Sequence, residues 1–110
     1  MEINSRAVGL VMVVDIAGVI DAKSVLQAQE QLLALVRPGS KLLLDLRRVT
    51  YMSSSGLRML LSVYRQVSAN NGSIALAEAS DEIKEDMAVT GFLRYFSIYD
   101  SLDEGLAALQ

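Results

Sequence analysis

The sequence of 110 residues contains no cysteine and no histidine. Without cysteine, the chain has no disulfide framework, no thiolate metal site and no cysteine nucleophile. Without histidine, it lacks the commonest general base and the commonest ligand of transition metals, so a Ser-His-Asp hydrolase cannot be built from this chain alone. No Gly-rich phosphate loop of the form G-x-x-x-x-G-K-[ST] occurs either. We therefore expect a protein that is not an enzyme and that holds neither a metal ion nor a cofactor.

Basic residues and long apolar runs are also scarce. The 10 Lys and Arg residues are outnumbered by 13 Asp and Glu residues, and the net charge is −3. Because the chain has no basic stripe, we expect it to bind neither nucleic acid nor an anionic membrane. No apolar run approaches the roughly 18 residues of a membrane span, and the N-terminus lacks the pattern of a signal peptide. These features predict a small soluble protein of the cytoplasm.

Apolar residues, by contrast, make up 52% of the chain, which is typical of a folded protein with a core. A chain of this length predicts one domain over residues 1–110. Apolar runs rich in β-branched residues or leucine predict buried strands at 10–18, 41–46 and 73–79, with a short one at 97–100. Weak alternation over residues 2–8 predicts an opening strand that forms a hairpin with the next one through a turn at Gly9.

The segments between these strands have the spacing of amphipathic helices. Candidate helix starts are Asp21 or Ser24, the serine run at 53–55, Ser80 or Asp81, and Ser101. Candidate helix ends are Pro38-Gly39, Asn70-Asn71-Gly72 and Gly91. In the helix that ends at Gly91, Ile83 and Met87 are expected to face inward, with Val89 as a further candidate. Strands that alternate with helices after a hairpin predict an α/β fold, with about four helices packed on a mostly parallel sheet. The opening strand is a candidate exposed edge, so a monomer and a weak homodimer both remain open.

Three consecutive serines and a glycine, Ser53 to Gly56, precede the helix predicted over 55–69. A hydroxyl at a helix start is an ordinary cap worth about 1 kcal/mol, and a glycine there permits tight packing. Alternatively, a phosphate on Ser54 would add about −1.5 to −2 charges beside backbone N–H groups that favour an anion. A partner docked over this helix start would then meet a new dianion and dissociate. The local chemistry leaves both interpretations open.

The outward face of the helix 55–69 is a candidate docking surface. The periodicity predicts a core face of Leu57, Leu60, Leu61, Tyr64 and Val67. The outward positions are then Arg58, Met59, Ser62, Val63 and Gln66. Met59 and Val63 are apolar and four residues apart, which fits either contact with a partner or packing under a loop.

Charged residues near the serine run have two interpretations as well. Arg47, Arg48 and Arg58 are either solvated surface or groups that steer an acidic partner or hold its nucleotide phosphates. Asp21 and Asp45 are expected at strand ends, where they either cap helices and pair with arginines or belong to a partner surface. Two carboxylates without a third ligand are too few for a metal site.

Three segments together resemble a STAS domain, and specifically the bacterial anti-sigma factor antagonists. They are GVID at 18–21, LLLDLRRVTYMSSSGL at 42–57 and TGFLRYFSIYDSLDEGLAAL at 90–109. The first resembles the family's G-x-[LI]-D after the second strand, and the second its D-S-[ST]-G-L phosphorylation loop. The third resembles the C-terminal strand and helix. The resemblance covers nearly the whole chain and implies one STAS domain over residues 1–110.

The resemblance implies a role for each position of the loop. The family's phosphoacceptor directly follows the loop Asp, and that position is Ser54 here. Ser55, Gly56 and Leu57 match the residues that follow. The loop Asp itself is replaced by Ser53, so a carboxylate that would orient the serine is missing and Ser53 becomes an alternative acceptor.

The function that the resemblance implies is a partner-switching cycle. The unphosphorylated antagonist binds a serine kinase that is also an anti-sigma factor, and a sigma factor is thereby released. The kinase uses ATP and Mg²⁺ to phosphorylate the loop serine, the complex dissociates, and a PP2C-type phosphatase restores the serine. The implied partner surface comprises Asp21, Arg47, Ser53, Ser54, Ser55, Gly56, Arg58, Met59, Ser62 and Val63. The alternative is a STAS interaction or scaffold subunit, for example of a lipid-transport or sensory complex, that is not regulated by phosphorylation.

Overall fold

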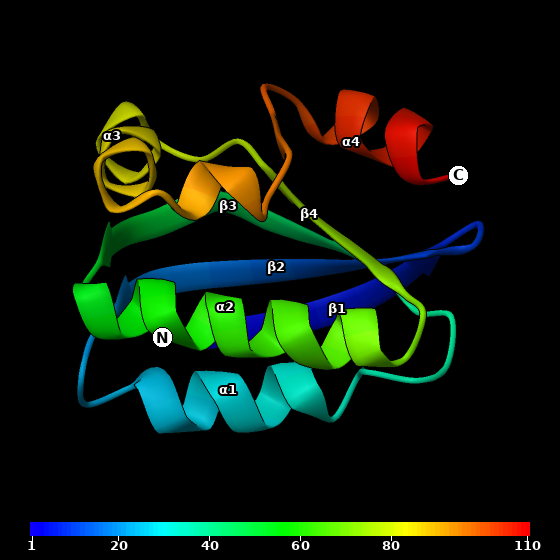
Figure 1. Cartoon of the computed structure of the whole chain (residues 1–110), viewed down its shortest axis with the longest axis horizontal. Coiled ribbons are helices and arrows are strands. Elements are labelled where there is room, and N and C mark those ends of the chain that lie inside the picture. The colour runs from blue at the N-terminus through cyan, green and yellow to red at the C-terminus, as the bar shows by residue number, and fades with distance from the viewer.

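The computed structural model describes residues 1–110, and its five strands form one sheet in the order β1-β2-β3-β4-β5 (Figure 1). The strands are β1 (Glu2–Val8), β2 (Val11–Ile20), β3 (Lys41–Met52), β4 (Ser73–Ala77) and β5 (Ile98–Tyr99). β1 runs antiparallel to β2, and all other neighbours are parallel. The helices are α1 (Val25–Leu33), α2 (Ser54–Ala69), α3 (Asp81–Thr90) and α4 (Leu102–Leu109), with a 3₁₀ turn, η1 (Phe92–Arg94). The predicted α/β fold is confirmed.

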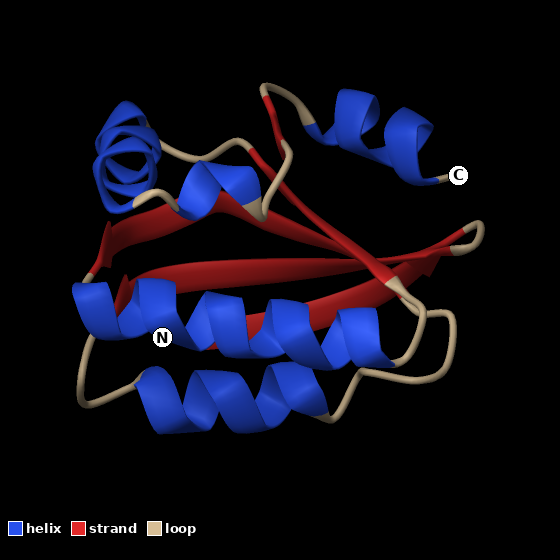
Figure 2. Cartoon of the chain, in the orientation of Figure 1, coloured by secondary structure: helices blue, strands red, loops and turns tan.

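Helices cover both faces of the sheet because side chains alternate along each strand (Figure 2). The larger core lies between one face of the sheet and α1, α2 and α3, and its strand residues include Val14, Ile16, Leu42, Leu44 and Leu76. The smaller core lies on the other face, where Val11, Val13, Leu43, Ala75 and Ala77 pack with residues of α4. α1 and α2 lie side by side (Figure 1). None of the helices is both long and apolar enough to cross a membrane.

Several helix caps lie where the sequence predicts them. Ser80 caps α3 by accepting a hydrogen bond from the backbone N–H of Ile83 at 3.2 Å, and Ser101 caps α4 in the same way. Gly91 ends α3 in the left-handed conformation, with φ of 80°. These caps depend on contacts between residues three or four positions apart, which explains why a local pattern can predict them.

Two strands are longer than the sequence predicts, and this changes the place of Asp45. β3 continues through the polar pair at 47–48 to Met52, since Val49 and Met52 are buried again after it. Asp45 therefore lies within β3, 4% exposed and in register with Asp15 of β2, and the prediction that it ends a strand is wrong. β2 likewise extends to Ile20, with shifts of register between Asp15 and Val19.

Two predictions about the helices are also wrong in detail. α1 ends at Leu33, ahead of Pro38, and the Arg37 guanidinium donates hydrogen bonds to the carbonyls of Ala34 and Val36 at 2.9 Å each. The bond to Ala34, the C-cap residue, satisfies a carbonyl group that the end of the helix leaves free. Val89, expected to face inward from α3, is 88% exposed.

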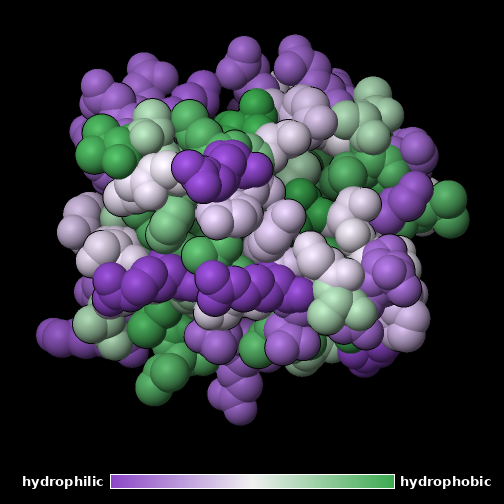
Figure 3. All heavy atoms as spheres, in the orientation of Figure 1, coloured by the Kyte–Doolittle hydropathy of each residue, from purple (hydrophilic) through white to green (hydrophobic).

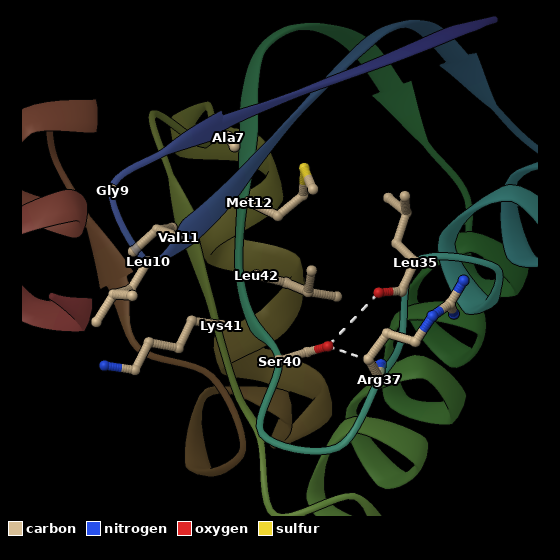
Figure 4. Close-up of a pocket in the computed structure, with 10 residues that line it drawn as sticks. All are labelled: Ala7, Gly9, Leu10, Val11, Met12, Leu35, Arg37, Ser40, Lys41 and Leu42. Carbon is tan, nitrogen blue, oxygen red and sulfur yellow. Dashed lines mark hydrogen bonds between the residues drawn. The ribbon is translucent and has the colours of Figure 1, made fainter.

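A hollow of about 210 Å³ lies at the end of the sheet that carries the β1–β2 turn (Figure 4). Its lining includes Met12, Leu35 and Leu42, with Arg37 and Lys41 pointing in opposite directions at its rim. Ser40 holds the loop beside it, because its hydroxyl accepts a hydrogen bond from the Arg37 N–H at 2.7 Å. The serine run lies at the opposite end of the sheet (Figure 1), so this hollow includes no residue of the predicted site.

Candidate functional site

The three serines at the start of α2 have different hydrogen bonds. Ser53 is the N-cap, and its hydroxyl accepts from the backbone N–H of Gly56 at 3.3 Å. The hydroxyl of Ser55 accepts from the Arg58 guanidinium at 3.3 Å. Ser54 is exposed, and its hydroxyl has no hydrogen-bond partner in the protein. Ser54 is therefore the serine whose hydroxyl is free to react without breaking a bond of the fold.

Gly56 brings the first turn of α2 close to the ends of β2 and β3. A Cβ atom on Gly56 would lie 2.7 Å from Cγ of Met52 and 3.0 Å from Cγ2 of Ile20. The backbone N–H of Ser53 also donates to the carbonyl of Ile20 at 2.9 Å. These contacts hold the serine run against the carboxyl ends of two neighbouring strands.

The loop between β2 and α1 lies beside the serine run through that bond to Ile20. Asp21 orders the loop, since its carboxylate accepts from the backbone N–H groups of Lys23 and Ser24 at 2.9 and 3.2 Å. The hydroxyl of Ser24 donates to the carbonyl of Val19 at 2.9 Å. The N-cap residue of α1 is Ser24, and no side chain caps the helix, so of the two candidates Asp21 orders the loop and does not cap α1. Its place in a partner surface remains a prediction.

Met59 and Val63 do not lie on the outward face of α2, and the prediction that they do is wrong. They are 2% and 0% exposed, respectively, and belong to the larger core. The buried stripe of α2 consists of Gly56, Leu57, Met59, Leu60, Val63 and Val67. α2 packs both on the sheet and beside α1. It therefore buries a wider stripe of side chains than a helix that contacts only a sheet. These two side chains are therefore not available to a docked partner.

The solvent face of α2 is polar. Arg58, Arg65 and Gln66 are exposed, and Ser62 is half-buried and donates its hydroxyl to the carbonyl of Arg58 at 3.3 Å. Figure 3 shows the result as a band of hydrophilic residues across the molecule at the height of α2.

The arginines of β3 are not equivalent. Arg48 pairs with Asp15 at 3.1 Å and lies 3.9 Å from Glu2, so acids of β1 and β2 already neutralise its charge. Arg47 is exposed and forms no ion pair, while its backbone N–H donates to the Asp45 carboxylate at 3.0 Å. Of the two, Arg47 is the one whose guanidinium has no acidic partner.

A second hollow, of about 360 Å³, borders Ser54 and was not predicted from the sequence. It lies where the end of β3, the start of α2 and the outer side of α3 meet, and we refer to it as the Ser54 hollow. Its lining residues are Tyr51, Met52, Ser54, Leu57, Asp86, Val89 and Thr90. About thirty residues of sequence separate its two sides, so no local pattern could have indicated it.

Comparisons with known proteins agree on one family. The sequence model of the STAS domain matches residues 2–105. A Bordetella bronchiseptica protein named as an anti-sigma factor antagonist, BtrV, is 29% identical over 111 aligned positions, which cover 100% of this chain and 96% of that protein. The anti-sigma-B factor antagonist of Bacillus subtilis is 33% identical over 78 residues, 71% of this chain and 72% of its own length. The crystal structure of an anti-sigma factor antagonist from Mycobacterium paratuberculosis has a TM-score of 0.86 at 24% identity, covering 98% of this chain and 92% of that one, and so shares the fold.

Proposed function

The chain belongs to the STAS domain family and is similar over its whole length to anti-sigma factor antagonists, and from this we propose that it switches partners through phosphorylation of Ser54. In this proposal the unphosphorylated protein binds a serine kinase that is also an anti-sigma factor. Phosphorylation releases that partner, and a PP2C-type phosphatase restores the hydroxyl. The observation that carries the proposal is the exposed, unbonded hydroxyl of Ser54 beside two serines whose hydroxyls are occupied.

The replacement of the family's loop Asp by Ser53 is compatible with this role. Serine and aspartate are about equally good N-caps, and Ser53 accepts the capping hydrogen bond from Gly56. The backbone that presents Ser54 therefore does not depend on a carboxylate at position 53. The same bond disfavours Ser53 as the acceptor, because its phosphorylation would disturb the cap.

The start of α2 suits a phosphate that appears and disappears. The dianion would lie near the free N–H groups of the first turn, where the helix dipole favours negative charge. The fold is therefore expected to persist in both states, while a partner would meet about −1.5 to −2 additional charges at its interface. The switch is local and needs no rearrangement of the sheet.

The proposed partner surface surrounds Ser54. It comprises Asp21, Arg47, Ser53, Ser54, Ser55, Arg58 and Ser62, without Gly56, Met59 and Val63, which are buried. The kinase would supply ATP, Mg²⁺ and the catalytic groups. A kinase that uses ATP would meet this protein in the cytoplasm, where we therefore place it.

The test uses a serine kinase of the anti-sigma factor class from the same genome, with ATP and Mg²⁺. Intact mass analysis should show one phosphate on the wild type and on Ser53→Ala, and none on Ser54→Ala. If Ser54→Ala incorporates as much phosphate as the wild type, the site assignment is wrong.

A STAS scaffold or interaction subunit without phosphorylation is the second candidate, and the missing loop Asp favours it. The two candidates differ in their response to Ser54→Asp. A large loss of partner affinity supports the switch, whereas unchanged affinity supports the scaffold.

A further inference from the structure

The Ser54 hollow exposes apolar side chains that the rest of the core leaves uncovered. Tyr51 is 55% exposed and Val89 is 88% exposed, above a floor of Met52 and Leu57 that are 4% and 3% exposed. Figure 3 shows hydrophobic residues at the surface over α3, in contrast to the hydrophilic band over α2. The apolar surface near the serine run therefore lies on its α3 side and not on the α2 face.

The rim of the hollow on α3 is acidic. Asp86 lines the hollow, and Glu82 and Glu85 lie one helical turn before Asp86 and Val89. All three acids are exposed, and none of them forms an ion pair. The one lysine of α3, Lys84, is paired with Asp100 at 3.1 Å. The hollow thus combines an apolar floor with uncompensated negative charge on one side.

We propose that the Ser54 hollow receives an apolar side chain of the partner protein, flanked by Lys or Arg residues that meet Asp86 and its acidic neighbours. This inference rests on the proposed function and names the chemistry of the partner segment. An apolar anchor in a pocket with charged residues at the rim is the arrangement that protein interfaces favour. The volume of about 360 Å³ lies at the lower end of the range of ligand pockets in proteins.

This placement also explains how a phosphate on Ser54 would displace the partner. Ser54 lines the hollow itself, so the phosphate would occupy part of the space and would lose water when the apolar anchor entered. Removing a charged group from water without full pairing is strongly unfavourable. The phosphate would also attract the partner's basic residues, and this attraction opposes release. Release follows in this proposal because the phosphate and the apolar anchor compete for the same space, so the apolar contact is lost.

The first experiment uses the full chain and three peptides as probes: Arg-Arg-Leu-Arg-Arg, Arg-Arg-Ala-Arg-Arg and Glu-Glu-Leu-Glu-Glu. In a ¹⁵N NMR titration, the first peptide should shift the amides of Tyr51, Asp86, Val89 and Thr90. It should bind at least about fivefold more tightly than the other two, as expected for a central apolar anchor. Equal affinities, or shifts centred elsewhere, would overturn the proposal.

The second experiment measures the affinity for the serine kinase of the anti-sigma factor class. Val89→Ser and Asp86→Lys should each weaken binding by about fivefold or more. Leu26→Ser is the matched control, because Leu26 is an apolar helix residue that is 77% exposed and lies outside the hollow. All three positions are exposed, so folding should be preserved, and the NMR spectrum checks it.

The outcomes separate this inference from the proposed function. Suppose that Ser54→Asp abolishes binding while Val89→Ser and Asp86→Lys bind like the wild type. The phosphorylation switch is then supported, and the proposal that a partner side chain enters the Ser54 hollow is wrong. If the two hollow variants weaken binding and Ser54→Asp does not, the hollow is a docking site and the switch is wrong.

Discussion

Replacing Gly56 by alanine tests the close approach that positions Ser54. The new Cβ would lie 2.7 Å from Cγ of Met52 and 3.0 Å from Cγ2 of Ile20, two side chains of the buried core. Overpacking of this kind costs about 1–3 kcal/mol. Alanine regains up to about 1 kcal/mol of helix propensity relative to glycine, and less in the first turn. We therefore expect a net loss of about 0.5–2 kcal/mol in the free energy of unfolding.

Urea denaturation of Gly56→Ala measures this change, with Ser68→Ala as a control at an exposed position of α2. In a thermal scan the expected loss corresponds to a decrease in Tm of about 2–8 °C. Because the first turn of α2 must move away from β2 and β3, phosphorylation of Ser54 should also slow. A Gly56→Ala protein as stable as the wild type would show that the turn does not lie against Met52 and Ile20.

Three further predictions concern the same region. Ser53→Ala should lower the free energy of unfolding by about 1 kcal/mol through loss of the N-cap, whereas Ser54→Ala should change it by less than about 0.5 kcal/mol; urea denaturation of both variants separates the two roles. Met59→Ala should cost about 2–5 kcal/mol by the same assay because the side chain is buried, and a change below about 0.5 kcal/mol would restore its assignment to the surface. Arg48→Met should lower the free energy of unfolding by at most about 1 kcal/mol at low ionic strength, and by less in 1 M salt, because the ion pair between Arg48 and Asp15 is partly exposed. An equal loss of stability at both ionic strengths would contradict this prediction.

The prediction of the outward face of α2 failed for a physical reason. α2 has apolar residues at 57, 59, 60, 61, 63, 64 and 67, so more than one stripe at helical spacing can be drawn through it. The structure buries Met59 and Val63 and leaves Leu61 and Tyr64 half-buried. The choice depends on α1 packing beside α2, which is not a property of the α2 sequence.

The sequence by itself determined the order of the elements and most helix boundaries. Apolar runs, capping serines and terminating glycines act over three or four residues, so Ser80, Gly91 and Ser101 do in the fold what their neighbours in sequence predict. Resemblance over the whole chain likewise pointed to the family and to Ser54.

Only the tertiary structure decided which side chains are accessible around Ser54. In the fold, β3 continues past Arg47 and Arg48, and Asp45 is buried where β3 pairs with β2 and β4. Asp86 and Val89 of α3 lie next to Tyr51 and Ser54. Burial and proximity of this kind depend on contacts between segments tens of residues apart, which carry no periodic signal in either segment alone. The Ser54 hollow, from which we infer the chemistry of the partner segment, therefore exists only because β3, α2 and α3 pack together.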